Sequence, residues 1–373
     1  MKNKLFYVTY QSFPADTANS IQTISNLKYF SKNNYDVSLF FPLRERNSSD
    51  DFKIIDSHYN LGEEIKLIGI KHNLPFGKIN FFNSFWFLVS HFLWSRKTIK
   101  KILKGTDPDI YITRSDWILY FLSKKNKKVV FECHQLSKMR KIIINKCIKK
   151  TNTKIIFLNY ELRNSFNFSP SELKNTLVAH NGVDSDLFTN KKRPNNNKVI
   201  FVGSLKRFNS SRNLEFIIKA FSNKKINEKF ELLIVGGPNE EASKLISTVK
   251  SKNLEKSVKI FGRLKRIETI KLIEESNIGI LINSSNNEHS VNYTSPLKYF
   301  EYLYGGLKVV GVNFPAHKNL PFGDKIFLFN ENNVEDFINA LELASKSSLD
   351  ESLNLNQITL DSRVKKIIKF INS

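Results

Sequence analysis

The feature that most constrains the fold is an alternation of short apolar runs with segments of helical periodicity. It begins with a predicted strand at residues 5–9, a predicted helix at 19–31 and a second strand at 37–41. A strand–helix–strand order predicts parallel strands with helices packed on the faces of the sheet. The chain is therefore predicted to be an α/β protein.

The alternation runs through both halves of the chain and is interrupted once. Residues 189–198 form a polar, Pro-containing run without apolar periodicity, which we interpret as a linker. A chain of 373 residues is long enough for two domains with separate cores. We predict an N-terminal domain at 1–189, a C-terminal domain at 190–355, and a last helix at 356–373 that packs back on the first domain. Two such domains would face each other across a cleft between their sheet edges. The further predicted strands lie at residues 65–70, 109–113, 128–131, 155–158, 176–179, 198–202, 231–235, 258–261 and 278–282.

The charge balance is the unusual part of the composition. Hydrophobic residues make up 41% and charged residues 25%, which is typical of a soluble globular protein and excludes a disordered one. Lys and Arg number 58 against 35 Asp and Glu, for a net charge of +23. This excess points to an anionic membrane surface or to nucleic acid, and an AT-rich genome explains it equally well.

The distribution of charge argues against a nucleic-acid-binding arm. Residues 1–188 hold 29 basic and 16 acidic residues, and residues 189–373 hold 29 and 19, so the net charges are +13 and +10. No known DNA- or RNA-binding motif accompanies them. We therefore expect no nucleic-acid partner.

The sequence predicts a cytoplasmic protein without a spanning helix. Cys133 and Cys147 have no metal-type spacing, so reduced thiols are expected. The N-terminal apolar run reads as a strand, and no uncharged apolar segment reaches about 18 residues. The aromatic segment 80–104 is predicted to be a buried core helix, because its apolar residues spread around most of its circumference. The basic segment 138–150 is the better candidate for contact with a membrane surface.

One stretch, SPLKYFEYLYGG at residues 295–306, suggests a binding site. Ser295 and Pro296 predict a turn into a helix that ends at the Gly pair, before the apolar run 308–312. Such a turn leaves backbone N–H groups and a positive dipole end free, which suits a diphosphate. Glu301, one turn further, would accept hydrogen bonds from a ribose diol. The alternative is an ordinary αβ unit with a surface glutamate.

Polar residues at other predicted strand ends add to this picture. His134 follows the strand at 128–131, and its alternative role is that of a structural histidine bonded to a backbone carbonyl. Gly203 follows the strand at 198–202, with Arg207 and Arg212 just beyond. A glycine beside guanidinium groups suits a phosphate, although a solvated loop would look the same. The absence of a G-x-G-x-x-G pattern gives no support for a dinucleotide cofactor.

Several ordered motifs resemble one family, the retaining glycosyltransferases of family 4. That family has the GT-B fold of two facing Rossmann-like domains. In the first half the resemblance is looser and rests on PDIYITRS at 108–115 and FECHQ at 131–135. In the second half it covers HNGVD at 180–184, VGSL at 202–205, LLIVGG at 232–237, VKIFGRL at 258–264 and SPLKYFEYLYGGLKVVGV at 295–312.

The resemblance implies that a nucleotide-diphosphate sugar binds mainly to the second domain. Glu301 would bind the ribose hydroxyls, and Arg212 matches the cation that binds the diphosphate, with Arg207 as a second one. His134 matches the histidine that reaches the donor sugar, and Arg114 lies on a neighbouring, acceptor-side loop. The remaining donor-binding residues are Gly203 beside a phosphate, Gly262 and Arg263 on the loop that flanks the nucleobase, Tyr293, and the backbone of Ser295, Pro296 and Leu297 around the diphosphate.

The chain departs from the family pattern at two places. Tyr293 stands eight residues before Glu301, where the family commonly has a glutamate that touches the transferred sugar. Glu288 would replace it if the loop folded back. Residues 14–16 replace a Gly-Gly pair near the first strand. These departures leave the donor sugar and the acceptor open.

The predicted function is retaining transfer of a sugar from a nucleotide-diphosphate sugar to a lipid-linked or surface-polysaccharide acceptor, as in cell-envelope biosynthesis. No D-x-D motif is present where a metal would be needed, so neither metal nor cofactor is expected. The enzyme would be cytoplasmic, with a peripheral position on the inner face of the cell membrane as an open alternative. The alternatives are a GT-B-fold sugar-nucleotide epimerase or hydrolase, and a catalytically silent binding protein.

Overall fold

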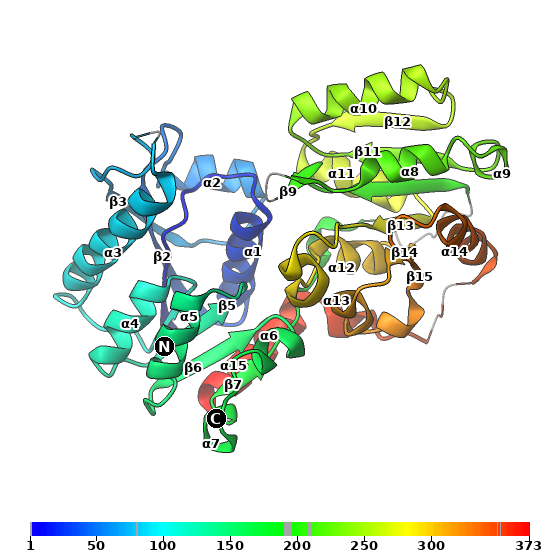
Figure 1. The fold of residues 1–373 in the computed structure, drawn as a ribbon. Helices are drawn as coiled ribbons and strands as arrows, with labels where there is room; N and C mark the ends of the chain where they lie inside the picture. Colours follow the sequence, from blue (N-terminus) through cyan, green and yellow to red (C-terminus); the bar gives the residue numbers. More distant parts are fainter. Residues whose placement is uncertain (1, 80, 190–195, 208–209, 349, 351) are drawn as a thin grey trace. The chain divides into compact units, whose positions relative to one another are not determined.

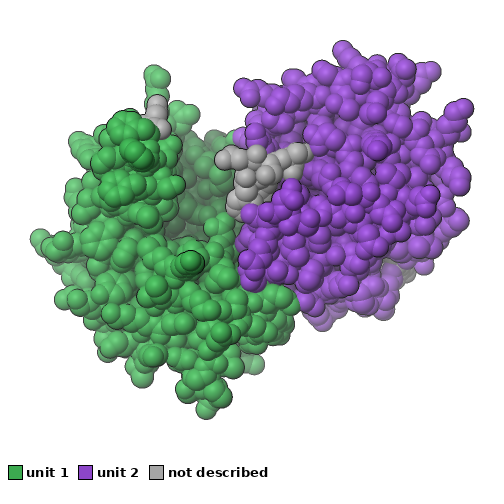
Figure 2. All heavy atoms as spheres, in the orientation of Figure 1, with its two compact units in different colours: residues 1–179, 363–373 green, residues 180–362 purple. Residues whose placement is uncertain are grey.

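The computed structural model describes residues 2–79, 81–189, 196–207, 210–348, 350 and 352–373. The chain divides into two compact units, residues 1–179 with 363–373 (unit 1) and residues 180–362 (unit 2), which Figures 1 and 2 show. The predicted linker falls largely on residues 190–195, which lie outside the described residues.

Unit 1 is built on a seven-stranded parallel sheet with the strand order β3-β2-β1-β4-β5-β6-β7. The strands are β1 (Asn3–Val8), β2 (Tyr35–Leu43), β3 (Lys66–Lys71), β4 (Ile110–Thr113), β5 (Val129–Cys133), β6 (Thr153–Phe157) and β7 (Thr176–Val178). The helices between them are α1 (Ala18–Lys32), α2 (Phe52–Tyr59), α3 (Asn83–Ile102), α4 (Asp116–Lys124), α5 (Lys138–Cys147), α6 (Tyr160–Asn164) and α7 (Pro170–Leu173).

Polar side chains just beyond the strand ends cap the helices that follow. The Ser115 hydroxyl accepts from the Ile118 N–H at the start of α4, and the Asn159 side chain accepts from the Leu162 N–H at 2.8 Å in α6. Such caps satisfy backbone donors that have no partner inside the helix.

Unit 2 has a six-stranded parallel sheet with the order β12-β11-β8-β13-β14-β15. Its strands are β8 (Lys198–Val202), β11 (Glu231–Val235), β12 (Val258–Gly262), β13 (Ile278–Leu281), β14 (Lys308–Val312) and β15 (Phe327–Phe329), and a short antiparallel pair, β9 (Lys206–Arg207) and β10 (Ser210–Ser211), follows β8. The helices are α8 (Leu214–Ala220), α9 (Lys224–Asn227), α10 (Asn239–Ser251), α11 (Arg266–Glu274), α12 (Leu297–Tyr304), α13 (Pro315–Lys318) and α14 (Val334–Lys346). Single-turn or π-helical segments are η1 (Ser185–Leu187), η2 (His289–Tyr293), η3 (Gly323–Lys325) and η4 (Leu355–Ile358).

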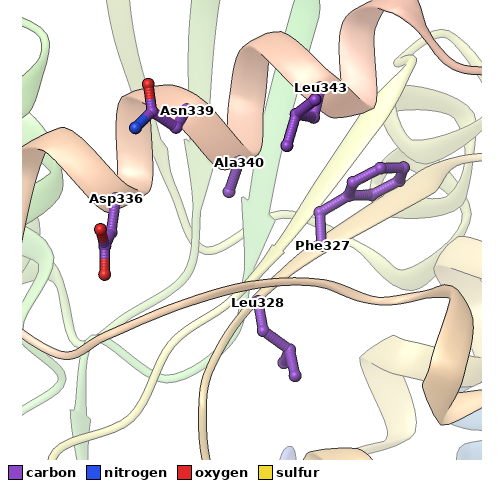
Figure 3. Close-up of a pocket in the computed structure, with 6 residues that line it drawn as sticks. All are labelled: Phe327, Leu328, Asp336, Asn339, Ala340 and Leu343. Atoms are coloured by element: carbon purple, nitrogen blue, oxygen red, sulfur yellow. The ribbon is translucent and has the colours of Figure 1, made fainter.

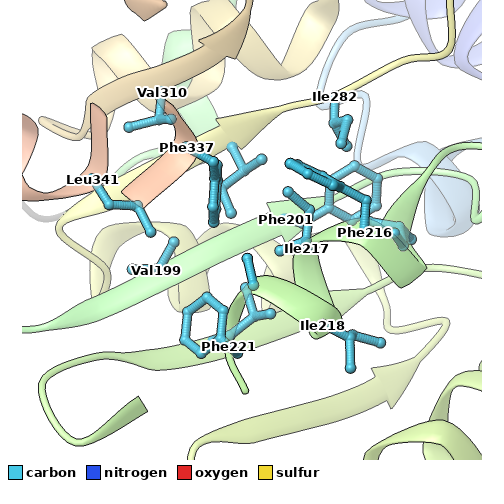
Figure 4. Packing of buried hydrophobic residues seen from close by; sticks show 14 of the residues in the cluster. Val199, Phe201, Phe216, Ile217, Ile218, Phe221, Ile282, Val310, Phe337 and Leu341 are labelled. Atoms are coloured by element: carbon cyan, nitrogen blue, oxygen red, sulfur yellow. The ribbon is translucent and has the colours of Figure 1, made fainter. Parts of the chain in front are cut away.

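The core of unit 2 explains why its strands read as continuous apolar runs. Strands of a parallel sheet with helices on both faces are buried on both sides. Figure 4 shows one face, where Val199 and Phe201 of β8 pack with Phe216 and Ile217 of α8 and with Phe337 of α14. The prediction of two α/β units, each with a parallel sheet, is confirmed.

The last helix, α15 (Leu360–Asn372), begins in unit 2 and continues in unit 1. Its apolar residues Val364, Ile367 and Ile371 are buried. Lys366 Nζ donates to the Val178 carbonyl of β7 at 3.0 Å, and Lys154 Nζ of β6 donates to the Phe370 carbonyl. The far end of the sequence is thus bonded to the edge of the sheet in unit 1.

One sequence interpretation of a helix is wrong. The segment predicted as a buried core helix forms α3, but Phe85, Leu88 and Leu93 on its outer side are exposed. Its apolar residues spread widely because they cover both an inner and an outer face. In α5, Ile143, Ile144 and Cys147 are buried while Ile142 is 70% exposed, so contact of the segment 138–150 with a membrane surface stays a prediction. Within the part of the chain that the structure describes, no helix has the length and apolar character to cross a membrane.

Candidate functional site

The predicted turn and helix at residues 295–306 form as expected. α12 begins at Leu297, with Pro296 in the N-cap position at φ −67° and ψ 124°, and it ends before Gly305. The N-cap residue, Pro296, makes no side-chain hydrogen bond to the first turn of α12. The first N–H groups of a helix without such a cap favour an anionic ligand, together with the helix dipole. The geometry therefore supports a diphosphate position at Pro296 and Leu297, both half-buried.

The segment before α12 is held by the loop that follows β7. The Asn181 N–H donates to Ser295 Oγ at 3.0 Å, and Asn181 Nδ2 donates to the Ser295 carbonyl at 2.5 Å. Both residues are buried. A Cβ added at Gly182 would lie 2.9 Å from the Thr359 carbonyl carbon, so the loop needs glycine there. Asn181 therefore fixes the backbone entering α12, and Gly182 allows the close approach of residue 359.

Glu301 is a buried carboxylate that two cations neutralise. Its Oε1 accepts from Arg266 Nη2 at 2.7 Å and its Oε2 accepts from Lys298 Nζ at 2.6 Å. Burial by itself would raise the pKa of Glu301, but the charges of Arg266 and Lys298 outweigh it and lower this pKa to about 2. Glu301 is thus an ionised hydrogen-bond acceptor over the whole neutral range.

The two cations differ from Glu301 in being partly open to solvent. The Arg266 side chain is 22% exposed and the Lys298 side chain 24%, against 4% for Glu301. Burial lowers the pKa of Lys298 to about 8, against the opposing pull of the Glu301 charge. Each carboxylate oxygen has a second lone pair, so Glu301 keeps acceptor capacity for a further donor. The i, i+3 spacing of Lys298 and Glu301 is visible in the sequence, but the partnership with Arg266 is not.

Gly203 and Arg212 lie next to each other, as the sequence predicts for a phosphate-binding loop. Arg212 Nη2 donates to Asn283 Oδ1 at 2.5 Å, and its guanidinium stands 5.6 Å from the centre of the Phe201 ring. A Cβ added at Gly203 would lie 2.9 Å from Arg212 Nη1. Because Gly203 has no side chain, there is space beside it for the Arg212 guanidinium. The side chain of Arg207 lies outside the described residues.

The glycines of the neighbouring strand ends allow close backbone contacts. Gly262 has φ +65°, which favours glycine, and its carbonyl accepts from the Gly236 N–H at 2.7 Å. Arg263 is exposed, and a Cβ added at Gly237 would lie 3.3 Å from its Nε. Gly262 and Arg263 are thus at the carboxyl end of β12, where the sequence predicts the nucleobase side.

The hydroxyl of Tyr293 is hydrogen-bonded to a carboxylate. The π-helical segment η2 ends at Tyr293, whose hydroxyl donates to Glu288 Oε1 at 2.9 Å. Burial and the Glu288 carboxylate both raise the pKa of Tyr293, so it remains a protonated donor. The position that departs from the family pattern is therefore bonded to the acidic side chain considered as its replacement.

In unit 1, Arg114 and His134 follow neighbouring strands of the sheet. Arg114 is buried, and its Nε donates to Glu132 Oε2 at 2.9 Å while Nη1 donates to Asn19 Oδ1 at 2.5 Å. The ring of His134 is half-buried, and its buried Nε2 makes no hydrogen bond to any residue that the structure describes. Burial, reinforced by Arg114, lowers the pKa of His134 well below its ordinary value, so the imidazole is neutral. The sequence did not reveal that Arg114 is bonded to a buried carboxylate.

Two further features of the described residues bear on the site. No group of three or more His, Cys, Asp or Glu side chains among them is arranged to hold a metal ion. A hollow between β15 and α14 is lined by Phe327, Leu328, Asp336, Asn339, Ala340 and Leu343 (Figure 3). None of the predicted site residues lines it, and Asp336 is bonded to Asn330 at 2.6 Å, so we assign it no role in the reaction.

Comparison with known proteins gives the class of this protein. Residues 196–346, less than half of the chain, match the family model described as glycosyl transferases group 1. This match indicates a glycosyltransferase. A search of curated protein sequences finds no match.

Solved structures give the fold. Alr3699/HepE of Anabaena, solved with UDP and glucose, is similar over 100% of both chains with a TM-score of 0.69 and 14% identity. Sucrose-phosphate synthase of Thermosynechococcus elongatus has a TM-score of 0.68 and 13% identity over 99% of this chain and 95% of that one. WaaG, a glycosyltransferase involved in lipopolysaccharide biosynthesis, has a TM-score of 0.59 and 11% identity over 99% and 95%. The fold is GT-B, with two Rossmann-like α/β domains.

Proposed function

We propose that this chain is a retaining, metal-independent glycosyltransferase of family 4. It would move a sugar from a nucleotide-diphosphate sugar to a lipid-linked or surface-polysaccharide acceptor at the cytoplasmic face of the cell envelope. The observation that carries the proposal is Glu301, an ionised and buried carboxylate one turn inside α12, whose N-cap residue Pro296 makes no side-chain hydrogen bond to the first turn. The matched family segment, residues 196–346, contains this helix.

The charged groups around α12 in unit 2 suit the donor. A lone carboxylate beside a diphosphate would repel it, whereas Glu301 with Arg266 and Lys298 forms a group of net charge +1. Arg212 adds a further cation at the end of β8. Donors fixed before the reaction stabilise the negative charge that develops on a leaving diphosphate, without reorganisation during the step. In this proposal, the side chain of Arg212 and the backbone N–H groups around Ser295 and Leu297 supply most of the rate enhancement, while Pro296, which has no N–H, shapes the turn.

Glu301 would bind the ribose of the nucleotide. An ionised carboxylate accepts two hydrogen bonds from a vicinal diol, and Arg266 and Lys298 hold its plane in one orientation. Gly262 and Arg263, at the end of β12, would flank the base, because Gly262 allows the close backbone approach that a planar ring needs. HepE was solved with UDP, so UDP-sugars are the first donors to test.

Two residues would act on the transferred sugar. Glu288, bonded to the Tyr293 hydroxyl, would replace the glutamate that the family commonly places at position 293. His134, neutral and with an unbonded buried nitrogen, would make one hydrogen bond to the sugar. Arg114 would act on the acceptor side through its position after β4. Retention of configuration follows from front-side attack by the acceptor, which needs no enzyme nucleophile.

The experiment is a thermal-shift panel of UDP-, GDP- and ADP-sugars, followed by product analysis with and without an acceptor. We expect one nucleotide class to raise the melting temperature, and the bound donor to be consumed only when an acceptor is added. Rapid donor consumption without acceptor would favour the epimerase or hydrolase alternative, which uses acidic groups such as Glu288 for proton transfer. Binding without turnover under any condition would favour a silent binding protein.

A further inference from the structure

The outer face of α3 is apolar at its N-terminal half although it is exposed. Phe82 is 76% exposed, Phe85 56%, Leu88 44% and Leu93 42%. The inner face of the same helix buries Trp94, so the exposed residues are not needed to hold the helix on the sheet. A group of exposed large apolar side chains on one helix marks an interaction surface.

The apolar surface continues onto α4, which contacts α3 within unit 1. The ring of Phe92 lies 4.8 Å from Trp117 and 5.6 Å from Phe121, measured between ring centres. Trp117, Tyr120 and Phe121 are half-buried, so part of each ring faces solvent. In Figure 1, α3, α4 and α5 follow one another along one side of unit 1. The aromatic surface therefore spans two adjacent helices.

Basic residues border this surface, and acidic ones are almost absent from it. Residues 81–106 contain five Lys or Arg and no Asp or Glu, and residues 138–150 contain six and none. The Lys146 Nζ of α5 stands 5.6 Å from the centre of the Tyr120 ring. Asp116, at the start of α4, is buried and paired with Arg140 at 2.7 Å, so its charge does not face solvent. The exposed cations are Arg96, Lys97, Lys100 and Lys101 of α3 and Lys146, Lys149 and Lys150 on and after α5.

The combination of aromatic and basic residues selects one kind of partner. A second copy of this chain, paired through the same face, would bring like charges together. Nucleic acid would use the cations, but it gives no reason for exposed Phe85, Leu88 and Leu93. An anionic bilayer satisfies both parts, because aromatic and aliphatic side chains enter the interface while Lys and Arg contact lipid phosphates.

We propose that the outer face of α3 and α4, with the cations of α3 and α5 around it, binds the surface of an anionic lipid bilayer. Phe82, Phe85, Leu88 and Leu93 enter the headgroup region, and the basic residues lie along the phosphates. This site differs from the basic helix that the sequence favours, since α5 contributes charge while α3 contributes the inserted side chains. The proposal concerns a surface and holds whether or not the transferase function does.

The test is co-sedimentation of the full chain with vesicles of phosphatidylcholine containing phosphatidylglycerol, compared with pure phosphatidylcholine. We expect binding to the anionic vesicles. We expect the pair Phe85→Ser and Leu88→Ser to weaken this binding at least about tenfold, and the pair Lys97→Glu and Lys100→Glu to do the same. These side chains are exposed, so the variants should keep the wild-type melting temperature.

Matched controls in unit 2 separate location from composition. Leu343→Ser removes an exposed apolar residue of α14, and Lys250→Glu with Lys252→Glu reverses two exposed charges at the end of α10. Both controls should bind vesicles like the wild type. The proposal is overturned if the wild type stays in solution with anionic vesicles, if the α3 variants bind like the controls, or if the same variants instead dissociate a dimer. Vesicle binding without any nucleotide-induced thermal shift would reject the proposed transferase and leave this surface assignment standing.

Discussion

Two buried glutamates, one in each unit, have the same chemistry, but the cations paired with them differ in access to solvent. Glu132 of β5 pairs with Arg114 and Arg363, and Glu301 of α12 pairs with Arg266 and Lys298. Glu132 and Glu301 are each 3% exposed as whole residues. The cations around Glu132 are themselves buried, with 5% and 3% of their side chains exposed, whereas those around Glu301 keep 22% and 24%. A fully enclosed group suits a structural role, and a group with an open side suits a ligand.

The Glu132 group connects distant parts of unit 1. Glu132 accepts from Arg114 Nε at 2.9 Å, from Arg363 Nη2 at 3.0 Å and from the Tyr7 hydroxyl at 3.2 Å. Burial would raise the pKa of Glu132, but the charges of Arg114 and Arg363 lower it well below its ordinary value. Arg363 lies on α15, so this group bonds the last helix to the middle of the sheet. It also holds Arg114, one of the predicted site residues, in place.

The largest effect is expected from breaking the enclosed group. Arg363→Met leaves Glu132 with one cation in a buried environment, which costs about 3–5 kcal/mol of the free energy of unfolding. Urea unfolding followed by circular dichroism measures this loss. Lys365→Met, an exposed neighbour on α15, is the control and should cost less than about 0.5 kcal/mol. A loss at Arg363 as small as that of the control would contradict a structural role for the Glu132 group.

The open group should respond less in stability. Glu301→Gln leaves Arg266 and Lys298 without a counter-charge, but water reaches both, so we expect a loss of about 1–3 kcal/mol. The same urea experiment gives the comparison with Arg363→Met. If Glu301→Gln were the more damaging of the two, the distinction between enclosed and open groups would be lost.

The backbone support of α12 can be tested without touching any group that contacts donor. Asn181→Ala removes the hydrogen bond from its side chain to the Ser295 carbonyl, which contributes about 0.5–1.5 kcal/mol. We expect this variant to bind nucleotide several-fold more weakly while Glu301 and Arg212 stay intact. A control, Asn286→Ala, changes an exposed residue of the loop before η2. Equal affinities for the two variants would show that Asn181 does not position the α12 entrance.

The smallest expected effect is a dependence of stability and nucleotide binding on pH, which arises in the group of Glu301, Arg266 and Lys298. Lys298 has a pKa of about 8 in the folded chain, lowered from 10.5 by burial. Between these two values the unfolded chain holds a proton that the folded chain has released, so this group's contribution to stability rises with pH. Nucleotide binding should change in the opposite direction, because the site loses a positive charge above pH 8.

The test compares nucleotide affinity at pH 7 and pH 9 for the wild type and Lys298→Arg. Arginine keeps its charge at both values, so the loss of affinity seen for the wild type should be smaller in this variant. Identical pH profiles for the two proteins would show that Lys298 does not titrate in this range.

The sequence predicts local features well, because they depend on neighbouring residues. The strands β8 and β11, the cap at Asn159 and the bounds of α12 all follow from apolar runs and turn residues. The sequence does not predict β15, because three residues are too few to show the periodicity of a strand. The second helix, α2, was missed as well, although Asp51 caps it through the Lys53 N–H.

Partners that are distant in sequence could not be predicted. Glu132 and Arg363 are 231 positions apart, and Glu301 and Arg266 are 35 apart, so no spacing rule connects them. The exposure of the outer face of α3 cannot be predicted from the sequence for a related reason. An apolar residue on an outer face looks the same in sequence as one in the core, and only the packing of α3 on its neighbours distinguishes them.

The most direct test of the central claim is a calorimetric titration of UDP and UDP-glucose into the wild type, Glu301→Gln and Glu255→Gln. Glu255 is exposed and lies outside the proposed site, so its variant is the matched control. The account predicts that the wild type and the control bind alike, and that Glu301→Gln binds at least about tenfold more weakly, which corresponds to about 1.4 kcal/mol. If all three proteins bind with equal affinity, Glu301 does not hold the nucleoside, and the proposed site at α12 is wrong.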